Sequence, residues 1–484
     1  MSTGAMKTIQ TIYLIVITFI LVGCSQWKEA SASIEKHPEI FPDYIGVTIP
    51  DNIAPLNFMI EGAEHVQAEF IRDGKVVLAS TGKEGAIDIP VNEWQSMLKE
   101  SAGVTLQVKV SAWNEEYPEG VVYQPFEINI AEEEIDGWIA YRLIEPGYIE
   151  YRQHGIYQRN LSTFEEKAII TNRKSESTCV NCHNFPSYSP ESMMFHARGK
   201  NGGTILYKQG ELKKIDFKST DFGRNTTYPA WHPDGRYIAF SSNTTHQVFF
   251  AQNRQEIEVF DTASDLVIYD TQTGKTITDP RFNTEDILET FPSWSPDGKS
   301  LYFVSHKAPV LPVKFSTNMH YDLLRVSFDA ETATFGTQID TLYNSREQGG
   351  SASYPRISSD GRYLLYTLSD YGTFPIWHHE ADLHMMDLTF NEPVDISVWN
   401  DPDNADSYHS WSSNGRWVVF GSRRNDGRYT HLYIGYLDKD GQAHKPFLLP
   451  QQDPRQYIWR LKSFNVPEFI AGEVELPEEA TDLF

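Results

Sequence analysis

The sequence predicts an all-β protein in which an N-terminal immunoglobulin-like β-sandwich precedes a β-propeller. Two observations support this fold class: short segments of alternating apolar and polar residues before residue 135, and an internal repeat of about 45–60 residues after it. The 484 residues include 26 Pro, 31 Gly and 13% aromatic side chains, which is typical of many short strands joined by tight turns. The same composition argues against a helical bundle.

Residues 1–23 are typical of a lipoprotein signal peptide. Lys7 precedes an uncharged, largely apolar run of eleven residues that begins at Ile12. As a helix this run spans about 16 Å, too short for a hydrocarbon core of about 30 Å, so we expect a cleaved signal rather than a membrane span. The sequence Leu-Val-Gly-Cys that ends at Cys24 resembles the bacterial lipoprotein signal. The resemblance implies lipidation of Cys24, with residues 24–33 as a polar tether; the alternative is an ordinary secretory signal that contains a cysteine.

Residues 34–135 are expected to form the β-sandwich. Residues 68–79 have the pattern of a hairpin whose turn is Asp73-Gly74. Apolar and polar residues alternate at 106–112 and again at 126–130, and strands spaced about 10–20 residues apart are typical of an immunoglobulin-like sandwich. No catalytic constellation is visible in this part, so we expect a spacer or a binding module.

The second part of the chain contains a repeat with the consensus Tyr/Phe-Pro-x-Trp-Ser-Pro-Asp-Gly-Arg. Its four copies begin at Tyr228, Phe291, Tyr354 and Tyr408, and their turn residues Asp234, Asp297, Asp360 and Asn414 are 63, 63 and 54 residues apart. The Asp-Gly or Asn-Gly pair allows the positive φ angles of a tight hairpin, and the apolar residues after it predict an inner strand. A degenerate fifth copy is expected to begin at Phe185-Pro186. Repeats of this size that each form a small sheet predict a propeller.

These segments resemble the WD-repeat-like motif of the TolB-like propeller family over roughly residues 180–440. The chain departs from the motif at Ile357, at Asn414 and in the shortened first copy. The resemblance implies six or seven blades, and we expect six, over residues 136–465. The last blade would be completed by residues 136–175 and by a C-terminal strand at Tyr457–Arg460, which leaves residues 466–484 as a loosely ordered acidic tail.

The charge and the repeat exclude some function classes. The 66 acidic residues outnumber the 41 Lys and Arg and give a formal net charge of −25, so we expect no nucleic-acid partner. No Gly-x-Ser-x-Gly motif follows the predicted blades, and fewer than 50 residues remain after the last predicted blade strand, Thr430–Gly435, so a prolyl-oligopeptidase-type hydrolase is not expected. A non-enzymatic role is favoured, although the sequence leaves an enzyme open.

The sequence Cys179-Val-Asn-Cys182-His183 is the attachment motif for c-type haem. Two thiols at this spacing reach both vinyl groups of one haem, and the adjacent His183 supplies an axial ligand to the iron. An exported protein is in the compartment where such attachment takes place. A redox-active cysteine pair and a zinc site are the alternatives.

The second axial ligand is expected just downstream of the motif. Alternation along a strand places Met194, His196 and Arg198 on one face and Met193 on the other. His196 is the favoured ligand and Met193 or Met194 the alternative, with Arg198 as a partner of a haem propionate. A water-bound or vacant sixth position and a ligand from elsewhere in the chain are further alternatives. The simpler interpretation is that Met193 belongs to the core and that His196 is a hydrogen-bonded histidine without a role at the iron.

A second histidine group lies at His378-His379, close to Asp382 and His384. It has the residue types of a metal site, but polar surface is the favoured interpretation.

The sequence thus predicts an envelope protein that is lipid-anchored, on the outer membrane and facing the periplasm, with one covalent haem c. It would act in electron transfer, redox sensing or another cytochrome-related function, with a protein partner at the propeller face. The alternative function is a TolB-like scaffold that binds envelope proteins or polymers without haem.

Overall fold

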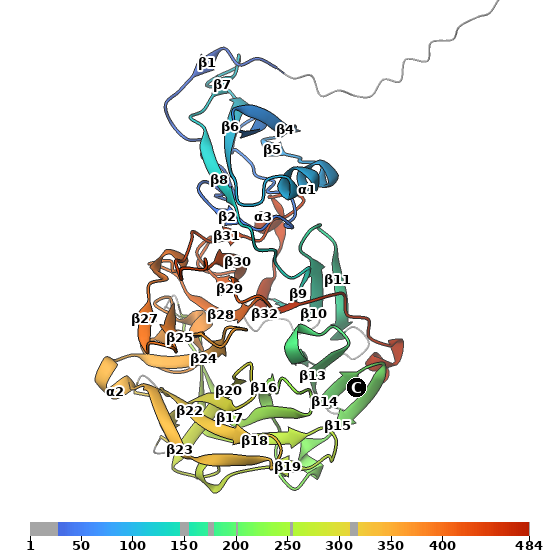
Figure 1. The fold of residues 1–484 in the computed structure, drawn as a ribbon, viewed down its shortest axis with the longest axis vertical. Coiled ribbons are helices and arrows are strands. Elements are labelled where there is room, and N and C mark those ends of the chain that lie inside the picture. The colour runs from blue at the N-terminus through green and yellow to red at the C-terminus, as the bar shows by residue number, and fades with distance from the viewer. Residues whose placement is uncertain are drawn as a thin grey trace, which may run out of the picture.

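The computed structural model describes residues 28–145, 154–172, 179–199, 202–251, 255–309 and 318–483, and it is mostly β (Figure 1). Its strands form one eight-stranded sheet and six four-stranded sheets, a propeller-like arrangement. Cys24 and the whole expected signal peptide lie outside these ranges. Within them, no helix is both long and apolar enough to cross a bilayer.

The eight-stranded sheet belongs to the N-terminal domain, at the top of Figure 1. Its strands are β1 (Ala32–Ser33), β2 (Thr48–Ile49), β3 (His65–Arg72), β4 (Lys75–Lys83), β5 (Ala86–Ile87), β6 (Thr105–Trp113), β7 (Val121–Val122) and β8 (Phe126–Ile130). The predicted hairpin is confirmed, since β3 pairs antiparallel with β4 and both Asp73 and Gly74 have positive φ. Helix α1 (Val91–Lys99), which the sequence analysis did not predict, buries Trp94 and Leu98 in this domain.

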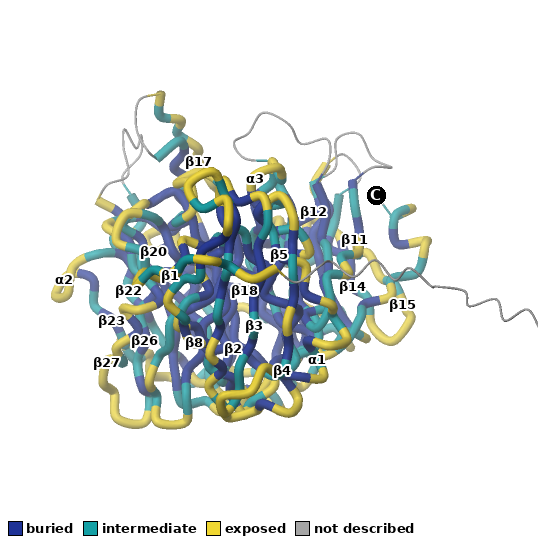
Figure 2. The backbone as a smooth tube through the Cα atoms, turned by 90° about the horizontal axis from the view of Figure 1, so that it is seen from above, coloured by how far each residue is buried: buried dark blue, intermediate teal, exposed yellow. Residues whose placement is uncertain are grey.

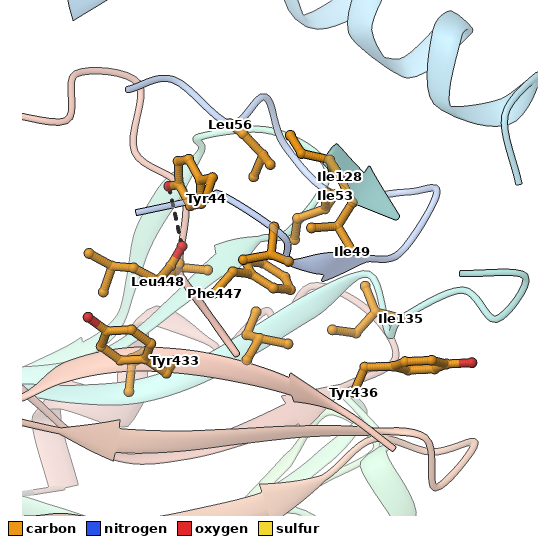
Figure 3. Packing of buried hydrophobic residues seen from close by; sticks show 14 of the residues in the cluster. Tyr44, Ile49, Ile53, Leu56, Ile128, Ile135, Tyr433, Tyr436, Phe447 and Leu448 are labelled. Atoms are coloured by element: carbon orange, nitrogen blue, oxygen red, sulfur yellow. Dashed lines mark hydrogen bonds between the residues drawn. The ribbon is translucent and has the colours of Figure 1, made fainter. Parts of the chain in front are cut away.

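The N-terminal domain shares a hydrophobic core with the last repeat sheet (Figure 3). Buried Tyr44 packs there, and its hydroxyl donates to the Leu448 carbonyl oxygen at 3.3 Å. The Asn57 amide donates to the Gln452 carbonyl oxygen at 2.8 Å. The expected spacer is therefore packed against the rest of the chain.

We number the six four-stranded sheets I to VI in chain order. Sheet I contains β9 (Trp138–Ile144), β10 (Gly155–Asn160), β11 (Glu166–Thr171) and β32 (Ser463–Ile470), and sheet II contains β12 (Cys179–Asn184), β13 (Ser192–Arg198), β14 (Gly203–Lys208) and β15 (Glu211–Ile215). Sheet III contains β16 (Thr227–Trp231), β17 (Tyr237–Phe249), β18 (Ile257–Asp270) and β19 (Thr276–Ile277), and sheet IV contains β20 (Ile287–Trp294), β21 (Ser300–Lys307), β22 (Asp322–Asp329) and β23 (Thr334–Tyr343). Sheet V contains β24 (Ser351–Ile357), β25 (Tyr363–Ser369), β26 (Asp382–Asp387) and β27 (Glu392–Val394), and sheet VI contains β28 (Asp406–Trp411), β29 (Trp417–Ser422), β30 (His431–Tyr436) and β31 (Phe447–Leu448). Figure 2 shows the buried strands in the middle of the molecule and the exposed loops around it.

Sheet I joins the two ends of the repeat region, because β32 pairs antiparallel with β9. The predicted C-terminal strand at Tyr457–Arg460 is wrong: helix α3 (Gln456–Trp459) lies there, and the strand begins at Ser463. The predicted boundary at 465 is also wrong, because residues 466–470 complete β32. The rest of the expected tail includes the 3-10 helix Glu478–Leu483, in which Ala480 is buried.

In the inner strand of each sheet, two consecutive residues have no cross-strand partner, which makes a β-bulge. The first of these two residues has a φ between 46° and 54° and is called the bulge residue here. The bulge residues are Cys182, Tyr228, Phe291, Tyr354, Tyr408 and Val466. In the four full repeats the bulge residue is the Tyr or Phe of the consensus. The predicted alignment of the degenerate copy is wrong by three residues, since Cys182-His183, and not Phe185-Pro186, has the register of Tyr228-Pro229.

We expect closure of sheet I to contribute strongly to stability. Phe464 on β32 is fully buried, and its ring packs edge-on against Tyr141 of β9 with centroids 4.9 Å apart. Phe464→Ala should lower the free energy of unfolding by about 3–5 kcal/mol, measured by urea unfolding. The control is Phe390→Ala, at a side chain 66% exposed, which should change it by less than about 0.5 kcal/mol. Equal losses in the two variants would contradict the assigned closure.

Candidate functional site

A cavity of about 390 Å³ lies where the inner strands of the six sheets converge. All six bulge residues line it, so every sheet contributes to its wall. Residues far apart in the sequence meet there: Arg142 comes from β9, Cys179 from β12 and Glu468 from β32.

The cysteine motif forms part of this wall. Cys179, Cys182 and His183 all lie on β12 and all line the cavity. Both cysteines are free thiols, and the Cys182 sulfur lies 3.6 Å from the Thr227 hydroxyl oxygen. Burial raises the pKa of the Cys179 thiol, so this thiol is protonated at neutral pH.

His183 is held as a neutral imidazole beside an acid. Its side chain is 1% exposed, its Nε2 atom has no hydrogen-bond partner among the described residues, and Glu468 Oε2 is 3.9 Å away. Burial lowers the pKa of His183 to about 3 and raises the pKa of Glu468 to about 8. The Asn184 amide donates to Glu468 Oε1 at 2.5 Å. A neutral imidazole with a partnerless nitrogen is the form of histidine that binds a metal.

The structure does not bring the predicted second ligands to this cavity. Met193 and Met194 are fully buried in two different hydrophobic clusters, and His196 Nδ1 contacts the Thr204 hydroxyl oxygen at 2.9 Å. All three lie on β13, the second strand of sheet II, whose side chains pack between neighbouring sheets. Of the described residues predicted downstream of the motif, only Arg198 lines the cavity, where it is the cross-strand partner of Cys179.

Four bulge residues form an aromatic arc that the sequence analysis did not assign to a site. The ring centroids of Tyr228 and Phe291 are 4.2 Å apart, those of Phe291 and Tyr354 are 5.6 Å apart, and those of Tyr354 and Tyr408 are 5.2 Å apart. The sequence signal for this arc is the Tyr or Phe that begins each repeat copy, but the repeat pattern alone predicts only a strand residue at that position.

Arginines give the cavity a charge opposite to that of the chain. Arg142, Arg198, Arg356 and Arg423 all line it. The Arg356 guanidinium lies 4.0 Å from the centroid of the Tyr354 ring, and that of Arg423 lies 3.4 Å from the Trp377 ring. An anionic group is therefore favoured inside a chain of net charge −25.

These residues fit a covalent haem better than the two alternatives. The wall offers two thiols, an imidazole nitrogen without a partner, aromatic rings and guanidinium groups. A redox-active pair needs a lowered thiol pKa, but burial raises that of Cys179. A zinc site needs further ligands, and no three His, Cys, Asp or Glu side chains among the described residues come together as a metal site.

The group at His378-His379 forms ion pairs. His378 Nε2 lies 2.7 Å from Glu258 Oε2, and His378 Nδ1 lies 3.0 Å from Glu380 Oε1. The His378 and Glu258 side chains are each 1% exposed. This bridge ties the β18 strand of sheet III to the segment after β25 of sheet V. His378 is thus occupied by carboxylates, and the described residues around it contain no metal-binding group.

No family model matches the chain, and no curated protein matches it. Among solved structures, puromycin hydrolase is similar at 12% identity over 64% of this chain and 52% of that one, with a TM-score of 0.36. Prolyl oligopeptidase B from Galerina marginata is 13% identical over 60% of this chain and 40% of its own, with a TM-score of 0.35. The tricorn protease is 12% identical over 82% of this chain and 43% of its own, with a TM-score of 0.31. This chain spans about half of the length of each of these proteins or less. The fold described above is based on the strand pairing and not on these similarities.

The His378 bridge predicts a pH-dependent contribution to stability. Although burial opposes it, hydrogen bonds to Glu258 and Glu380 raise the pKa of His378 to about 9. The bridge should therefore stabilise fully below the unfolded pKa near 6.5 and lose its effect as the pH rises through about 9. His378→Gln should lower the free energy of unfolding by about 2–3 kcal/mol at pH 6 and by much less at pH 9.5, measured by urea unfolding. His379→Gln, at a side chain 55% exposed, is the control, and a pH-independent loss in His378→Gln would refute the bridge.

Proposed function

We propose that this chain is a lipid-anchored envelope protein that carries one haem c, bound covalently through Cys179 and Cys182, with His183 as an axial ligand of the iron. One observation supports this proposal above the others: both thiols and the histidine line a single cavity wall, and the buried His183 Nε2 atom has no partner among the described residues. A bound haem would supply one-electron transfer at this wall.

We further infer that sheets I–VI are the six blades of a TolB-like propeller and that the N-terminal domain is immunoglobulin-like. The six identical irregularities in the inner strands support one repeated unit, and the pairing of β32 with β9 supports a closed ring. The placement on the outer membrane rests on the lipoprotein-like sequence that ends at Cys24.

The residues around the motif prepare the site for attachment. The Cys179 thiol is protonated and the His183 imidazole neutral, so neither carries a charge that an apolar macrocycle would have to bury. Guanidinium groups of Arg142 and Arg198 lie close enough to Cys179 to lower its pKa against the effect of burial. They can bind the carboxylates of a ligand at this wall.

Electron transfer with a basic protein partner is the role that this site supports best. The net charge of −25 favours association with a positively charged surface and speeds it electrostatically. The second candidate is a haem-independent scaffold, which the aromatic and arginine-lined cavity also suits, since it could take an anionic group of an envelope polymer.

We expect one haem per chain when the protein is produced in a bacterium with a cytochrome c maturation system. The pyridine haemochrome spectrum should have the position typical of two thioether bonds. Cys179→Ala and Cys182→Ala together should abolish the signal and leave the circular dichroism spectrum unchanged, whereas Ser189→Ala, in the loop after β12, should keep it. A matured wild-type chain without haem would exclude the redox function and leave the scaffold.

Lipid anchoring makes a separate prediction. Cys24→Ala should block acylation, so the chain should move from the membrane fraction to the soluble envelope fraction. The measurement is metabolic labelling with a clickable fatty acid, followed by fractionation. Ser25→Ala is the control and should remain labelled; acylation of the Cys24→Ala variant would rule out this anchor.

A further inference from the structure

We propose that the haem sits in a notch of the cavity wall formed by the bulge residues Cys182 and Val466, with its two carboxylates bound by Arg142 and Arg198. This inference rests on the proposed function. Beyond that function, it specifies where the haem lies in the cavity and which residues position it.

The notch follows from the ring of bulge residues. Going around the cavity, sheets III to VI contribute Tyr228, Phe291, Tyr354 and Tyr408, whose rings contact one another in series. The two remaining positions, in the neighbouring sheets I and II, hold the small side chains of Val466 and Cys182. The aromatic arc is therefore open on one side only, and this side contains the thiol of the attachment motif.

Val466 has an unusual conformation for its residue type. Its φ of 46° lies in the left-handed region, which a β-branched residue rarely adopts. The backbone at this position is the same as at the four aromatic bulge residues, so the bulge itself admits a large ring there. A small side chain at Val466 leaves room beside Cys182 that a Tyr or Phe would fill.

Each of the two arginines donates to the residue that directly precedes a bulge residue. The Arg142 Nη2 atom donates to Asn465 Oδ1 at 3.0 Å, and the Arg198 Nη2 atom donates to Thr227 Oγ1 at 3.1 Å. Asn465 and Thr227 directly precede the bulge residues of sheets I and III. The Arg142 guanidinium thus lies within sheet I, and that of Arg198 lies between sheets II and III.

Both arginines are available for an anion. Among the residues that the structure describes, their hydrogen bonds go to the neutral side chains of Asn465 and Thr227, and Arg142 Nε is buried without a partner there. By contrast, Arg356 and Arg423 lie against the rings of Tyr354 and Trp377. Two guanidinium groups without a carboxylate partner among the described residues, beside the small side chains of Cys182 and Val466, match a planar ligand that carries two carboxylates, which is the chemistry of haem.

The first test fills the notch. Val466→Phe should restore an aromatic ring at the fifth bulge position and reduce the haem content of the purified chain at least tenfold, with the thermal unfolding temperature within a few degrees of wild type. Val398→Phe, at an exposed side chain outside the cavity, is the control and should keep the wild-type haem content. A Val466→Phe chain with as much haem as wild type would overturn the notch while leaving the covalent haem in place.

The second test needs no change in the notch. In the haem-loaded chain, Arg142→Gln and Arg198→Gln combined should lower the midpoint potential, because loss of two positive charges favours the oxidised iron. Arg325→Gln on β22, which is outside the cavity lining, should leave the potential unchanged. An unchanged potential in the double variant would overturn the placement of the carboxylates. A wild-type chain without haem would instead overturn the proposed function itself.

Discussion

The pairing of β32 with β9 is the interaction on which the rest of the structure depends. It joins the last strand of the repeat region to the first sheet and so completes the wall of the central cavity (Figure 1). It also delivers Asn465, Val466 and Glu468 to the site, none of which is near the cysteine motif in the sequence. Because long-range pairing closes a large loop, its entropic cost has to be offset by buried contacts such as those of Phe464 and Phe469.

In each of the six sheets, the bulge directs one residue of the inner strand toward the cavity. Each bulge holds a non-glycine residue at positive φ, which costs of order 1–3 kcal/mol and persists only where the surrounding packing determines it. As a result, the bulge residue of every sheet lines the cavity. Four sheets use this position for an aromatic ring, and sheet II uses it for Cys182, so the Cys-x-x-Cys-His sequence replaces an aromatic residue and keeps the same bulge.

Much of the fold could be predicted because its signals are local. Asp-Gly turns and alternating apolar residues identify hairpins wherever they occur, and they located four of the six sheets and the β3–β4 hairpin. The register of sheet II could not be found this way, since its bulge holds Cys-His in place of Tyr-Pro and only strand pairing reveals the equivalence. A C-terminal strand beside residues 136–175 was predicted, but its position at Ser463–Ile470 and the contact of His183 with Glu468 could not be found, because each joins segments whose proximity no local pattern encodes.

The charge distribution imposes two opposite requirements on what this protein binds. Burial keeps Glu468 protonated and His183 neutral at pH 7, so four arginines face one other carboxylate in the cavity lining, that of Glu145, while the chain as a whole is strongly acidic. A ligand of the cavity is therefore selected for negative charge and a partner of the surface for positive charge. A redox carrier needs this separation, because its cofactor must stay inside while its partner docks outside. A scaffold could use the same cavity but would not need two thiols beside the arginines, and these thiols support the proposed redox role.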